Sequence, residues 1–450
     1  MTRMSVLACG LLLAIFAAPA PARSSAPEEV FQPNILVLVV DDVGVDFLAP
    51  WGFGTDLPYT PNIDALSAGG VRFTDAWAMP LCTPTRAALQ TGRHGFRTGV
   101  GTLVSASFAL ELAETTLPEM LDIGTGYAYA HGCFGKWHLG NPSVGGPLAP
   151  NLAGYSHFEG TVHNFVLPDT FYDWAKVENG VTKPCSGYAT SAVVNDTLGW
   201  IGAQSSPWFA MVNFHAPHWP WHTPPAHLYS TSLAHAPPPN IDPRPYAKAM
   251  MEAVDAEIGR LFAALGSSFE DTLVVLLADN GTDGLVVKPP FLPWKAKATI
   301  FEPGIRVPLI VSGPGVTPGV CAALVHVVDV FPTVAEAARV NLGLSLPDLK
   351  IDGISLWPYL ENPAAPSQRK LLYTEQFWPN GHNPPSNFDR TIRDERFKYV
   401  WSTVYGQVLF DLKFDPFETV NLFDQPPLDP VAKRAFRKLK KGLLDLLSDG

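Results

Sequence analysis

The sequence predicts an α/β fold, in which a large, mostly parallel mixed sheet carries helices on both faces and a small antiparallel α+β subdomain follows at the C-terminus. Three continuous runs of branched apolar residues, Asn34–Val40, 209–214 and Thr272–Ala278, predict buried strands with both faces covered. Helix-like stretches lie between these runs, and the apolar side chains of residues 246–265 recur with a period near 3.6. Strands that alternate with helices are typical of a sheet covered on both sides.

The first 23 residues have the pattern of a secretory signal peptide. Arg3 precedes an uncharged apolar run, residues 6–18, and Ala18-Pro19-Ala20 resembles a small-residue cleavage site. The run is too short to span a bilayer and no later run reaches that length, so we expect an exported protein, periplasmic or secreted, without stable membrane insertion. Cys9 stands in a sequence similar to a lipoprotein box, but the apolar run follows it instead of preceding it, which argues against lipidation.

After residue 358 the predicted helices and strands become shorter, and we place a domain boundary near residue 366. Residues 30–365 carry the long apolar runs and the helices that begin at Pro61 and continue from Arg86. Residues 366–450 carry shorter elements, predicted as three strands and a basic amphipathic helix at 371–377, 397–401, 408–412 and 430–447. We therefore predict a large domain over residues 30–365 and a small subdomain over residues 366–450.

Composition excludes several classes of protein. Hydrophobic residues make up 47% and charged residues 16% of the chain, which excludes intrinsic disorder. The formal net charge of −11 makes duplex nucleic acid a poor partner, because phosphate binding needs a basic surface. Cysteines other than Cys9 are too few for a dense disulfide framework, and the pairing of Cys133, Cys185 and Cys321 is left open.

Polar side chains follow each of the three predicted strands. Asp41 and Asp42 come directly after the first strand, His215 after the second, and Asp279 and Asn280 after the third. The carboxyl ends of strands form the ligand edge of an open α/β sheet, so we expect these four oxygen donors to lie together. Paired carboxylates at a strand end need a positive neighbour, and a divalent cation with hard oxygen ligands is one solution. The alternatives are a helix cap at Asp41-Asp42 and an ordinary turn at Asp279-Asn280-Gly281.

The segment from Leu81 to Arg86 is predicted to lie where a loop enters a helix. A helix N-terminus stabilises negative charge and lowers the pKa of a thiol, so Cys82 is a candidate nucleophile. Arg86, one turn further, is placed to hold an anion. The alternative is a buried structural cysteine, which is the commonest fate of the residue.

At these residues the chain resembles the formylglycine-dependent sulfatases, an arylsulfatase-like family of the alkaline-phosphatase-like superfamily. The pattern Cys-x-Pro-x-Arg, followed by a Thr-Gly step, is present as Cys82-Thr83-Pro84-Thr85-Arg86 and Thr91-Gly92. Further similar segments follow in order, and they include Gly135-Lys136-Trp137-His138, His218-Trp219-Pro220, Lys297 to Pro308 and Phe410-Asp411-Leu412. Gln90 and Pro303 depart from the usual residues. The resemblance covers nearly the whole mature chain and implies the alkaline-phosphatase-like fold.

The resemblance also implies a sulfuric ester hydrolase and a set of roles. Cys82 would be oxidised to formylglycine by a formylglycine-generating enzyme, and its hydrated aldehyde would be the nucleophile. One cation, Ca²⁺ more than Mg²⁺, would be held by residue 82 and four oxygen donors, Asp41, Asp42, Asp279 and Asn280. The remaining expected catalytic residues are Arg86, which steadies the diol, Lys136 and Lys297, which bind sulfate, His138 as a base, and His218 at the leaving alcohol.

Some points stay open at this level. His215 also begins a His-x-Pro sequence, so it is the alternative to His218, although the spacing of the following prolines favours His218. Arg306 is expected to form a structural ion pair. The substrate is an aryl or a carbohydrate sulfate, and Pro/Gly-rich stretches at residues 140–160, 223–243 and 284–293 are expected to rim its pocket. The alternative functions are a phosphonate or phosphodiester hydrolase of the same superfamily and a non-catalytic exported glycan-binding protein.

Overall fold

The computed structural model describes Met1, residues 32–205 and residues 207–449. The predicted signal peptide therefore lies outside the described residues, apart from Met1. Within the described part of the chain, no helix is long and apolar enough to cross a membrane. The placement of the domain boundary near residue 366 stays a prediction.

The core of the described chain is a mixed sheet of ten strands. Across the sheet the strands are β10 (Gly319–His326), β2 (Val71–Trp77), β9 (Leu309–Ser312), β8 (Thr272–Ala278), β1 (Asn34–Val40), β7 (Trp208–Asn213), β3 (Ala130–Lys136), β4 (His157–Thr161), β5 (Asp173–Glu178) and β6 (Val181–Ser186). The five central strands, from β8 to β4, run parallel. The predicted large mixed sheet and all three predicted strands are confirmed.

The parallel strands end at nearly the same level. Val40 of β1 pairs with Ala278 of β8, and Val39 of β1 pairs with Asn213 of β7. Asn213 in turn pairs with Gly135 of β3. The residues that follow β1, β8, β7 and β3 therefore emerge at one edge of the sheet, which is where an open α/β fold places its ligands.

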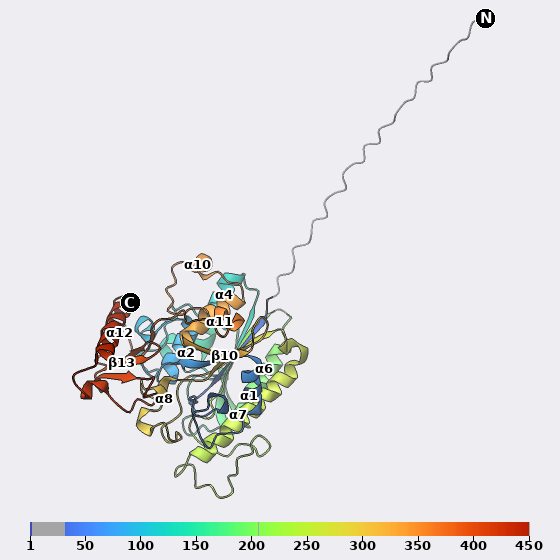
Figure 1. Ribbon diagram of the computed structural model, residues 1–450. Helices are drawn as coiled ribbons and strands as arrows, with labels where there is room; N and C mark the ends of the chain where they lie inside the picture. The colour runs from blue at the N-terminus through green and yellow to red at the C-terminus, as the bar shows by residue number, and fades with distance from the viewer. Residues whose placement is uncertain (2–31, 206, 450) are drawn as a thin grey trace. The chain divides into compact units, whose positions relative to one another are not determined.

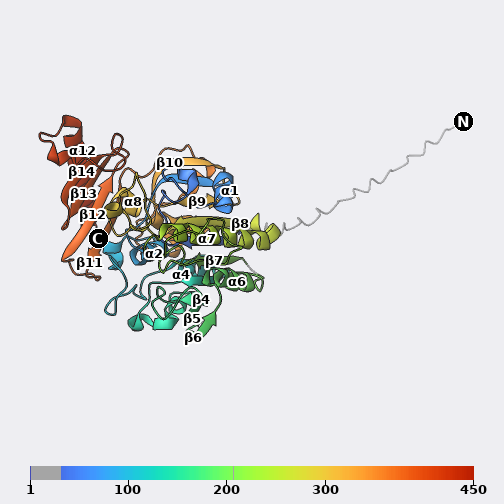
Figure 2. The same cartoon turned by 90° about the horizontal axis from the view of Figure 1, so that it is seen from below.

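Helices cover both faces of this sheet, as predicted (Figures 1 and 2). One group consists of α1 (Pro61–Gly69), α6 (Ala189–Ile201) and α7 (Arg244–Leu265), in which α7 contacts both of the others. A second group consists of α2 (Cys82–Thr91), α4 (Leu117–Thr125) and α9 (Val330–Ala337). The shorter helices are α3 (Gly95–Thr98), α5 (Ala149–Leu152), α8 (Glu302–Ile305), α10 (Leu342–Ser345) and α11 (Trp357–Glu361).

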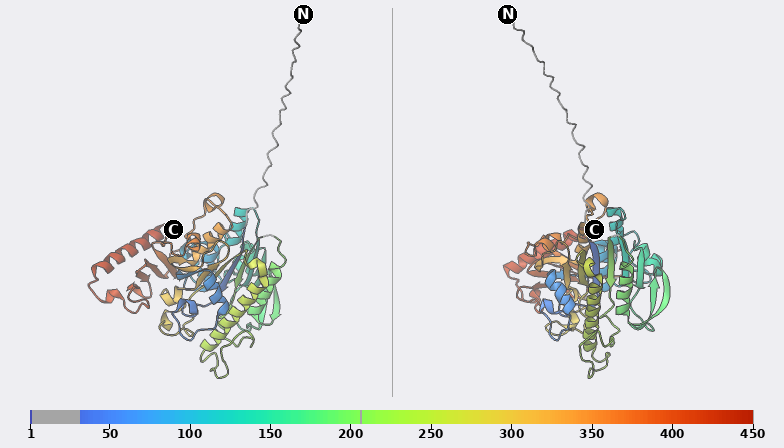
Figure 3. Two further views of the ribbon diagram at one scale, coloured as in Figure 1. Left: turned by 45° about the vertical axis from the view of Figure 1, so that its right-hand side comes forward. Right: turned by 90° about the vertical axis from the view of Figure 1, so that its right-hand side faces the viewer.

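A separate antiparallel sheet of four strands lies near the C-terminus (Figure 3). It consists of β11 (Leu372–Trp378), β12 (Asn387–Arg393), β13 (Phe397–Ser402) and β14 (Gly406–Asp411), and α12 (Pro430–Ser448) contacts β12 and β13. Three strands and the helix match the prediction. The sequence analysis missed β12, because Asn387, Asp389 and Arg390 interrupt its alternation with residues that are uncommon in strands.

One stretch expected to be a loop is partly ordered structure. Residues 140–160 contain the short helix α5 and the start of β4. The proline and glycine residues of this stretch hid the strand, because both residue types weaken a strand pattern. Residues 223–243 contain no helix or strand, as expected.

Polar contacts tie the small sheet to the large one. Lys398 of β13 is buried, and its ammonium group lies 3.2 Å from Glu302 and 2.7 Å from Glu418. Thr374 of β11 donates a hydrogen bond to the carbonyl oxygen of Ala78, which follows β2. The two sheets therefore share a buried polar interface as well as apolar contacts.

Two buried histidines lie at this interface, and their burial is expected to make the stability of the fold depend on pH. The rings of His94 and His326 are 4.9 Å apart, and His94 Nδ1 and His326 Nε2 have no hydrogen-bond partner among the described residues. Burial lowers the pKa of His94 to about 4 and that of His326 well below its ordinary value. Both rings are therefore neutral in the folded protein at neutral pH.

We expect these histidines to destabilise the fold as the pH falls from about 6.5 towards 4. In that range the unfolded chain takes up protons that the folded chain excludes, so the free energy of unfolding decreases. The expected contribution of His94 is about 2 kcal/mol between pH 7 and pH 5. Urea unfolding of the parent and of His94→Gln at both pH values measures it. An equal pH-dependent loss in the two proteins would contradict the assignment.

Candidate active site

The four expected oxygen donors meet at the carboxyl edge of the large sheet. Asp41 and Asp42 follow β1, Asp279 and Asn280 follow β8, and all four are buried. Asn280 Nδ2 donates a hydrogen bond of 2.8 Å to Asp42 Oδ1. The backbone N–H of Asp42 donates one of 3.3 Å to Asp279 Oδ1. The sequence analysis therefore grouped these residues correctly in space.

Three cationic side chains surround the carboxylates. Arg86 of α2 donates to Asp279 Oδ2 at 3.0 Å from Nε and 2.8 Å from a terminal nitrogen, and it lies 3.4 Å from Asp41. Lys136, the last residue of β3, forms an ion pair with Asp41. Lys297 lies 2.6 Å from Asp42. All three of the expected cations thus contact the expected carboxylates.

These charges set the ionisation of the cluster. Burial opposes ionisation of Asp42, but Lys297 and His218 outweigh it, and the pKa of Asp42 is lowered. Burial and then the nearby Asp41 raise the pKa of Asp279, although Arg86 opposes the shift. The pKa values of these two neighbouring carboxylates are therefore shifted in opposite directions, a feature that is common at sites where chemistry takes place.

Cys82 is the first residue of α2, a helix with a clear beginning and end. Pro84 stands in the first turn, where its missing N–H costs no helical hydrogen bond. Gly92 ends the helix in the left-handed region, at a φ of 68°, and a Cβ atom there would lie 2.9 Å from Phe331. The Cys82 thiol lies 3.1 Å from Nδ1 of His138. The helix therefore fixes Cys82 against the expected base.

The structure corrects one expectation about Cys82. The helix N-terminus was expected to lower the pKa of its thiol, but burial raises that pKa to about 11. Lys136 acts in the opposite direction, while Asp41 and Asp279 add to the rise. Burial and the two carboxylates therefore outweigh Lys136 and Lys297, and the unmodified residue is a neutral thiol at neutral pH.

His138 has a different electrostatic environment from that of an exposed histidine. Burial, with Lys136 and Arg86 close by, lowers its pKa well below the ordinary value. The ring is therefore neutral at neutral pH, and burial and the two cations disfavour its protonated form. Its backbone carbonyl accepts a hydrogen bond of 3.1 Å from the Thr83 hydroxyl, which ties the histidine to α2.

Three residues at the site have positive φ angles without being glycine. They are Asp42 at 62°, His138 at 60° and Ala298, next to Lys297, at 68°. Such conformations are strained for residues with a Cβ atom and cluster at functional sites, where the surrounding structure holds them.

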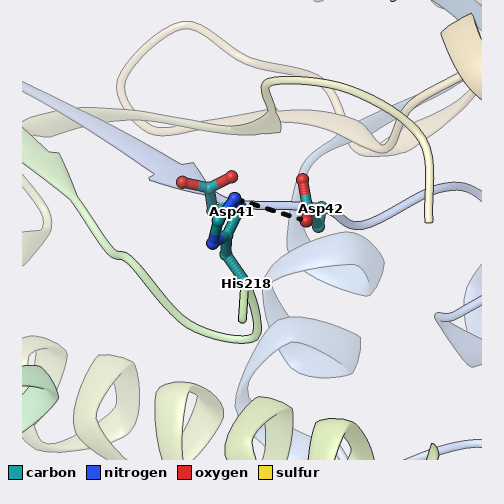
Figure 4. Close-up of side chains that lie close together, drawn as sticks. All are labelled: Asp41, Asp42 and His218. Atoms are coloured by element: carbon teal, nitrogen blue, oxygen red, sulfur yellow. Dashed lines mark ion pairs between the residues drawn. The ribbon is translucent and has the colours of Figure 1, made fainter. Parts of the chain in front are cut away.

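The two alternative histidines occupy distinct environments. His215 Nε2 lies 2.6 Å from the Thr161 hydroxyl, and its ring stacks on Phe165 at 4.2 Å. His218 Nε2 lies 3.9 Å from Asp42 Oδ2, and its side chain is 14% exposed (Figure 4). His215 is thus held by packing, whereas His218 faces the carboxylates and solvent.

Asp41, Asp42 and His218 together could hold a metal ion, since one ligand atom of each lies within 4.8 Å of the others (Figure 4). Two further oxygens nearby, Asp41 Oδ1 and Asn280 Oδ1, are buried and have no hydrogen-bond partner among the described residues. A buried oxygen without a partner costs free energy, and a cation would satisfy both of these.

The sequence analysis missed two polar residues of this region. Asn213 ends β7 and accepts a hydrogen bond of 3.1 Å from Arg86. His163 lies just after β4, close enough to His138 to contribute to lowering its pKa. Each of them follows or ends a central strand, and that position was the available signal. The strands β3 and β4 were themselves not predicted, so His163 had no context in the sequence.

Arg306 lies 3.4 Å from Asp75, which confirms its expected structural ion pair. Two aromatic side chains beyond His218 differ in their surroundings, since His222 packs against the ring of Phe171 at 4.2 Å, whereas Trp219 is 46% exposed. All four cysteines among the described residues are free thiols.

Comparison with known proteins gives the family. The family model described as Sulfatase matches residues 33–340, and the one described as N-sulphoglucosamine sulphohydrolase, C-terminal, matches residues 292–445. Human arylsulfatase A is 31% identical over 397 residues, covering 81% of this chain and 73% of that protein. An ulvan-active sulfatase of Formosa agariphila is 28% identical, covering 93% of this chain and 82% of that protein.

Solved structures agree on the fold. The crystal structure of Ps i-CgsB in complex with k-i-k-neocarrahexaose has a TM-score of 0.73 and 24% identity, and covers 91% of this chain and 92% of that one. The phosphonate monoester hydrolase of Agrobacterium radiobacter has a TM-score of 0.68 and 21% identity, and covers 91% of this chain and 95% of that one. Because the Sulfatase model spans most of the described chain and arylsulfatase A matches over a similar length, the chain belongs to the sulfatase family, within the alkaline-phosphatase-like superfamily, and is a sulfuric ester hydrolase.

Proposed function

We propose that the protein hydrolyses the sulfate ester of an aryl or carbohydrate alcohol with a formylglycine made from Cys82 and one divalent cation, Ca²⁺ in preference to Mg²⁺. The observation that carries the proposal is the meeting of Cys82 and His138 with three carboxylates and three cationic side chains at one edge of the sheet. The ulvan-active relative and the neocarrahexaose complex of a neighbour favour a sulfated saccharide as the substrate.

The residues present fit a hard divalent cation. Asp41, Asp42, Asp279 and Asn280 would hold it, beside residue 82, and the two unpartnered oxygens on Asp41 and Asn280 would become ligands. Carboxylate and amide oxygens are the ligands that Ca²⁺ prefers. When bound, the cation would polarise the sulfate oxygens and stabilise negative charge on them.

Cys82 is placed to become the nucleophile after modification. A formylglycine at position 82 would supply a hydrated aldehyde with one hydroxyl to attack sulfur and a second that allows sulfate to leave. His138, neutral and 3.1 Å from the present sulfur atom, would accept a proton from residue 82. Because Cys82 is only 1% exposed, the formylglycine-generating enzyme would have to act before the chain has folded.

The cations of the site would bind the sulfate group. Lys136 and Lys297 would act as point charges on its oxygens, and Arg86 would hold residue 82 and Asp279 in position. Lys297 is 15% exposed, so it lies on the open side of the cluster. Preorganised charges of this kind stabilise a transition state without reorganising during the reaction.

The location of the enzyme is a proposal of the same kind. Residues 1–23 carry the signal-peptide pattern, and export would bring the mature chain into contact with extracellular or periplasmic sulfated saccharides.

Matched esters of one alcohol test the proposed reaction. We expect the mature enzyme to release 4-nitrophenol from 4-nitrophenyl sulfate faster than from 4-nitrophenyl phosphate, bis(4-nitrophenyl) phosphate or 4-nitrophenyl phenylphosphonate. A phosphate or phosphonate ester hydrolysed with the larger kcat/KM would overturn the choice of a sulfate ester as the substrate.

His218 is expected to protonate the leaving alcohol, and His218→Gln tests this. General acid assistance matters most when the leaving alcohol is a poor one. We therefore expect kcat to fall by about 10²- to 10³-fold on a sugar sulfate and by less than about tenfold on 4-nitrophenyl sulfate. Steady-state kinetics on the two esters measure the difference.

His215→Gln is the matched control, since His215 is bonded to Thr161 and packed on Phe165. Any loss in this variant should be similar for the two esters and should accompany a lower thermal midpoint. A dependence on the leaving group in His215→Gln, with none in His218→Gln, would reverse the assignment.

A further inference from the structure

The C-terminal helix α12 presents a strongly basic surface. Its apolar side chains, Ala432, Ala435, Leu439 and Leu443, are buried against the small sheet. Six cationic side chains are exposed on the rest of the helix, and we call them the α12 basic face: Lys433, Arg434, Arg437, Lys438, Lys440 and Lys441. The helix contains one carboxylate, Asp445, on a chain with a formal net charge of −11.

Few carboxylates neutralise this face. Lys438 lies 2.9 Å from Asp394, and Lys441 lies 2.5 Å from Asp445. The other four members have no carboxylate within ion-pair distance among the described residues. Like charges at helical spacings of three and four residues destabilise a helix, so such a concentration carries a cost that a ligand would offset.

A cavity of about 600 Å³ adjoins the basic face. Arg434 and Lys438 line it together with three cations from outside the helix, Arg369, Lys370 and Arg396. Its volume is within the range of small-molecule sites. None of the residues of the candidate active site lines it.

More cationic than anionic side chains line the cavity. Asp394 and Glu395 are its two carboxylates, and they face five cations. Arg369 and Arg396 pair with Asp329 and Asp411, which lie outside the lining. Lys370 and Arg434 have no carboxylate partner among the described residues, so they are available to an anion. Glu395 also has no cationic partner among the described residues, so the cavity offers an anion two unpaired cations against one unpaired carboxylate.

We propose that the α12 basic face and this cavity form a second binding site for a sulfated polysaccharide, separate from the active site. The proposal rests on the proposed function, because the anionic polymer bound here would be the one whose sulfate esters are hydrolysed. Residues 433 to 441 extend for about 12 Å along the helix, so the face can contact several sulfate groups of one chain at once. Binding would hold the polymer near the enzyme between hydrolytic events and raise its local concentration.

Two other polyanions fit the face less well. An amphipathic helix binds a membrane by inserting its apolar face, but the apolar face of α12 is covered by the small sheet. Duplex DNA binds basic surfaces too, but it carries no sulfate ester, so binding it here would not bring a substrate of a sulfatase near the active site. The observations favour the saccharide.

The test compares two charge-neutralised variants of the mature enzyme. Lys370→Gln/Arg434→Gln removes the two unpaired cations of the cavity. Lys183→Gln/Arg339→Gln removes two exposed cations that line neither this cavity nor the neighbouring one beside Arg396, and it is the matched control. Binding of fluorescent dextran sulfate is measured by anisotropy at several salt concentrations, with uncharged dextran as the reference probe.

We expect the cavity variant to bind dextran sulfate about tenfold more weakly and to lose one to two units of the slope of log affinity against log salt. The control should bind like the parent, and all three proteins should hydrolyse 4-nitrophenyl sulfate equally. Equal binding of dextran sulfate by the parent and the cavity variant would overturn the proposal.

Two further probes identify the class of polyanion. Phosphatidylglycerol vesicles or duplex DNA that bind to the parent at least as tightly as dextran sulfate, with the same loss in the cavity variant, would overturn the saccharide assignment. The measurement requires no turnover, so failure of the proposed function, seen as no hydrolysis of any sulfate ester, is distinguished from failure of this binding site.

Discussion

Replacement of Cys82 by alanine is expected to lower kcat for a sulfate ester by on the order of 10⁵-fold, while the protein remains folded. The thiol is buried at the start of α2 and lies against His138, so the loss should come from removal of the nucleophile and not from a change in the fold. Initial rates on 4-nitrophenyl sulfate and the thermal midpoint measure the two effects.

Two further variants test whether the loss of activity comes from the nucleophile at position 82. Cys321→Ala removes another buried thiol, at β10, and should keep the parent rate. Cys82→Ser has a single hydroxyl and no route to a diol, so we expect it to release no more than one equivalent of alcohol and then stop. Continuous turnover by Cys82→Ser at the parent rate would show that the diol is not required.

The modification itself is measured on the tryptic peptide of residues 73–86, from protein made in its native host. An aldehyde at position 82 supports the formylglycine proposal, and a hydrazide probe should label it. An intact thiol in fully active enzyme would refute it. Because burial raises the pKa of the unmodified thiol to about 11, the unmodified residue is itself a poor nucleophile at neutral pH.

Removal of the divalent cation is expected to have the second largest effect. Extraction with a chelator should lower kcat by about 10²- to 10⁴-fold, and Ca²⁺ should restore activity better than Mg²⁺ does. The free energy of unfolding should also rise by about 3 kcal/mol at Ca²⁺ concentrations about a hundred times the dissociation constant. Calorimetric unfolding with and without Ca²⁺ measures this effect independently of turnover.

Asp41→Asn tests the residues that would hold the cation, and Asp271→Asn is its control. Asp41 is buried with one oxygen unpartnered, whereas Asp271 is exposed just before β8, at the opposite end of that strand from Asp279. We expect Asp41→Asn to lose both the stabilisation by Ca²⁺ and the activity, and Asp271→Asn to keep both. A full Ca²⁺ response in Asp41→Asn would place the cation elsewhere.

Three of the ten strands of the large sheet were predicted from sequence, because they are central strands buried on both faces. β1, β7 and β8 are continuous apolar runs, and short runs of this kind are typical of strands covered by helices on each side. β3 and β4 escaped prediction because glycines and histidines interrupt them, as in Ala130–Lys136. The place of β3 in the sheet depends on its pairing with β7, and that of β4 on its pairing with β3, and neither pairing is a local property of the sequence.

In the candidate active site too, some residues were predicted from sequence and others were not. The motifs around Cys82, Lys136, His218 and Asp279 resemble those of the sulfatase family in the same order, and this resemblance predicted that the four residues belong to one cluster. The carboxyl ends of parallel strands meet by the geometry of the fold, so each polar end could be assigned to the same edge. Asn213 ends a predicted strand but belongs to none of the motifs, and His163 follows a strand that was not predicted, so both were found only through their contacts.

By itself, the sequence determined the fold class, the family resemblance and most of the residues that meet at the sheet edge, but not Asn213 or His163. Only the tertiary structure decided the pKa of the Cys82 thiol, the different surroundings of His215 and His218, and the cavity beside the basic face of α12. The physical reason is that apolar periodicity and the order of motifs are local properties of the amino-acid sequence. Burial and the distances between charges depend instead on side chains that are far apart in sequence, and these two quantities set the pKa values and the binding surfaces.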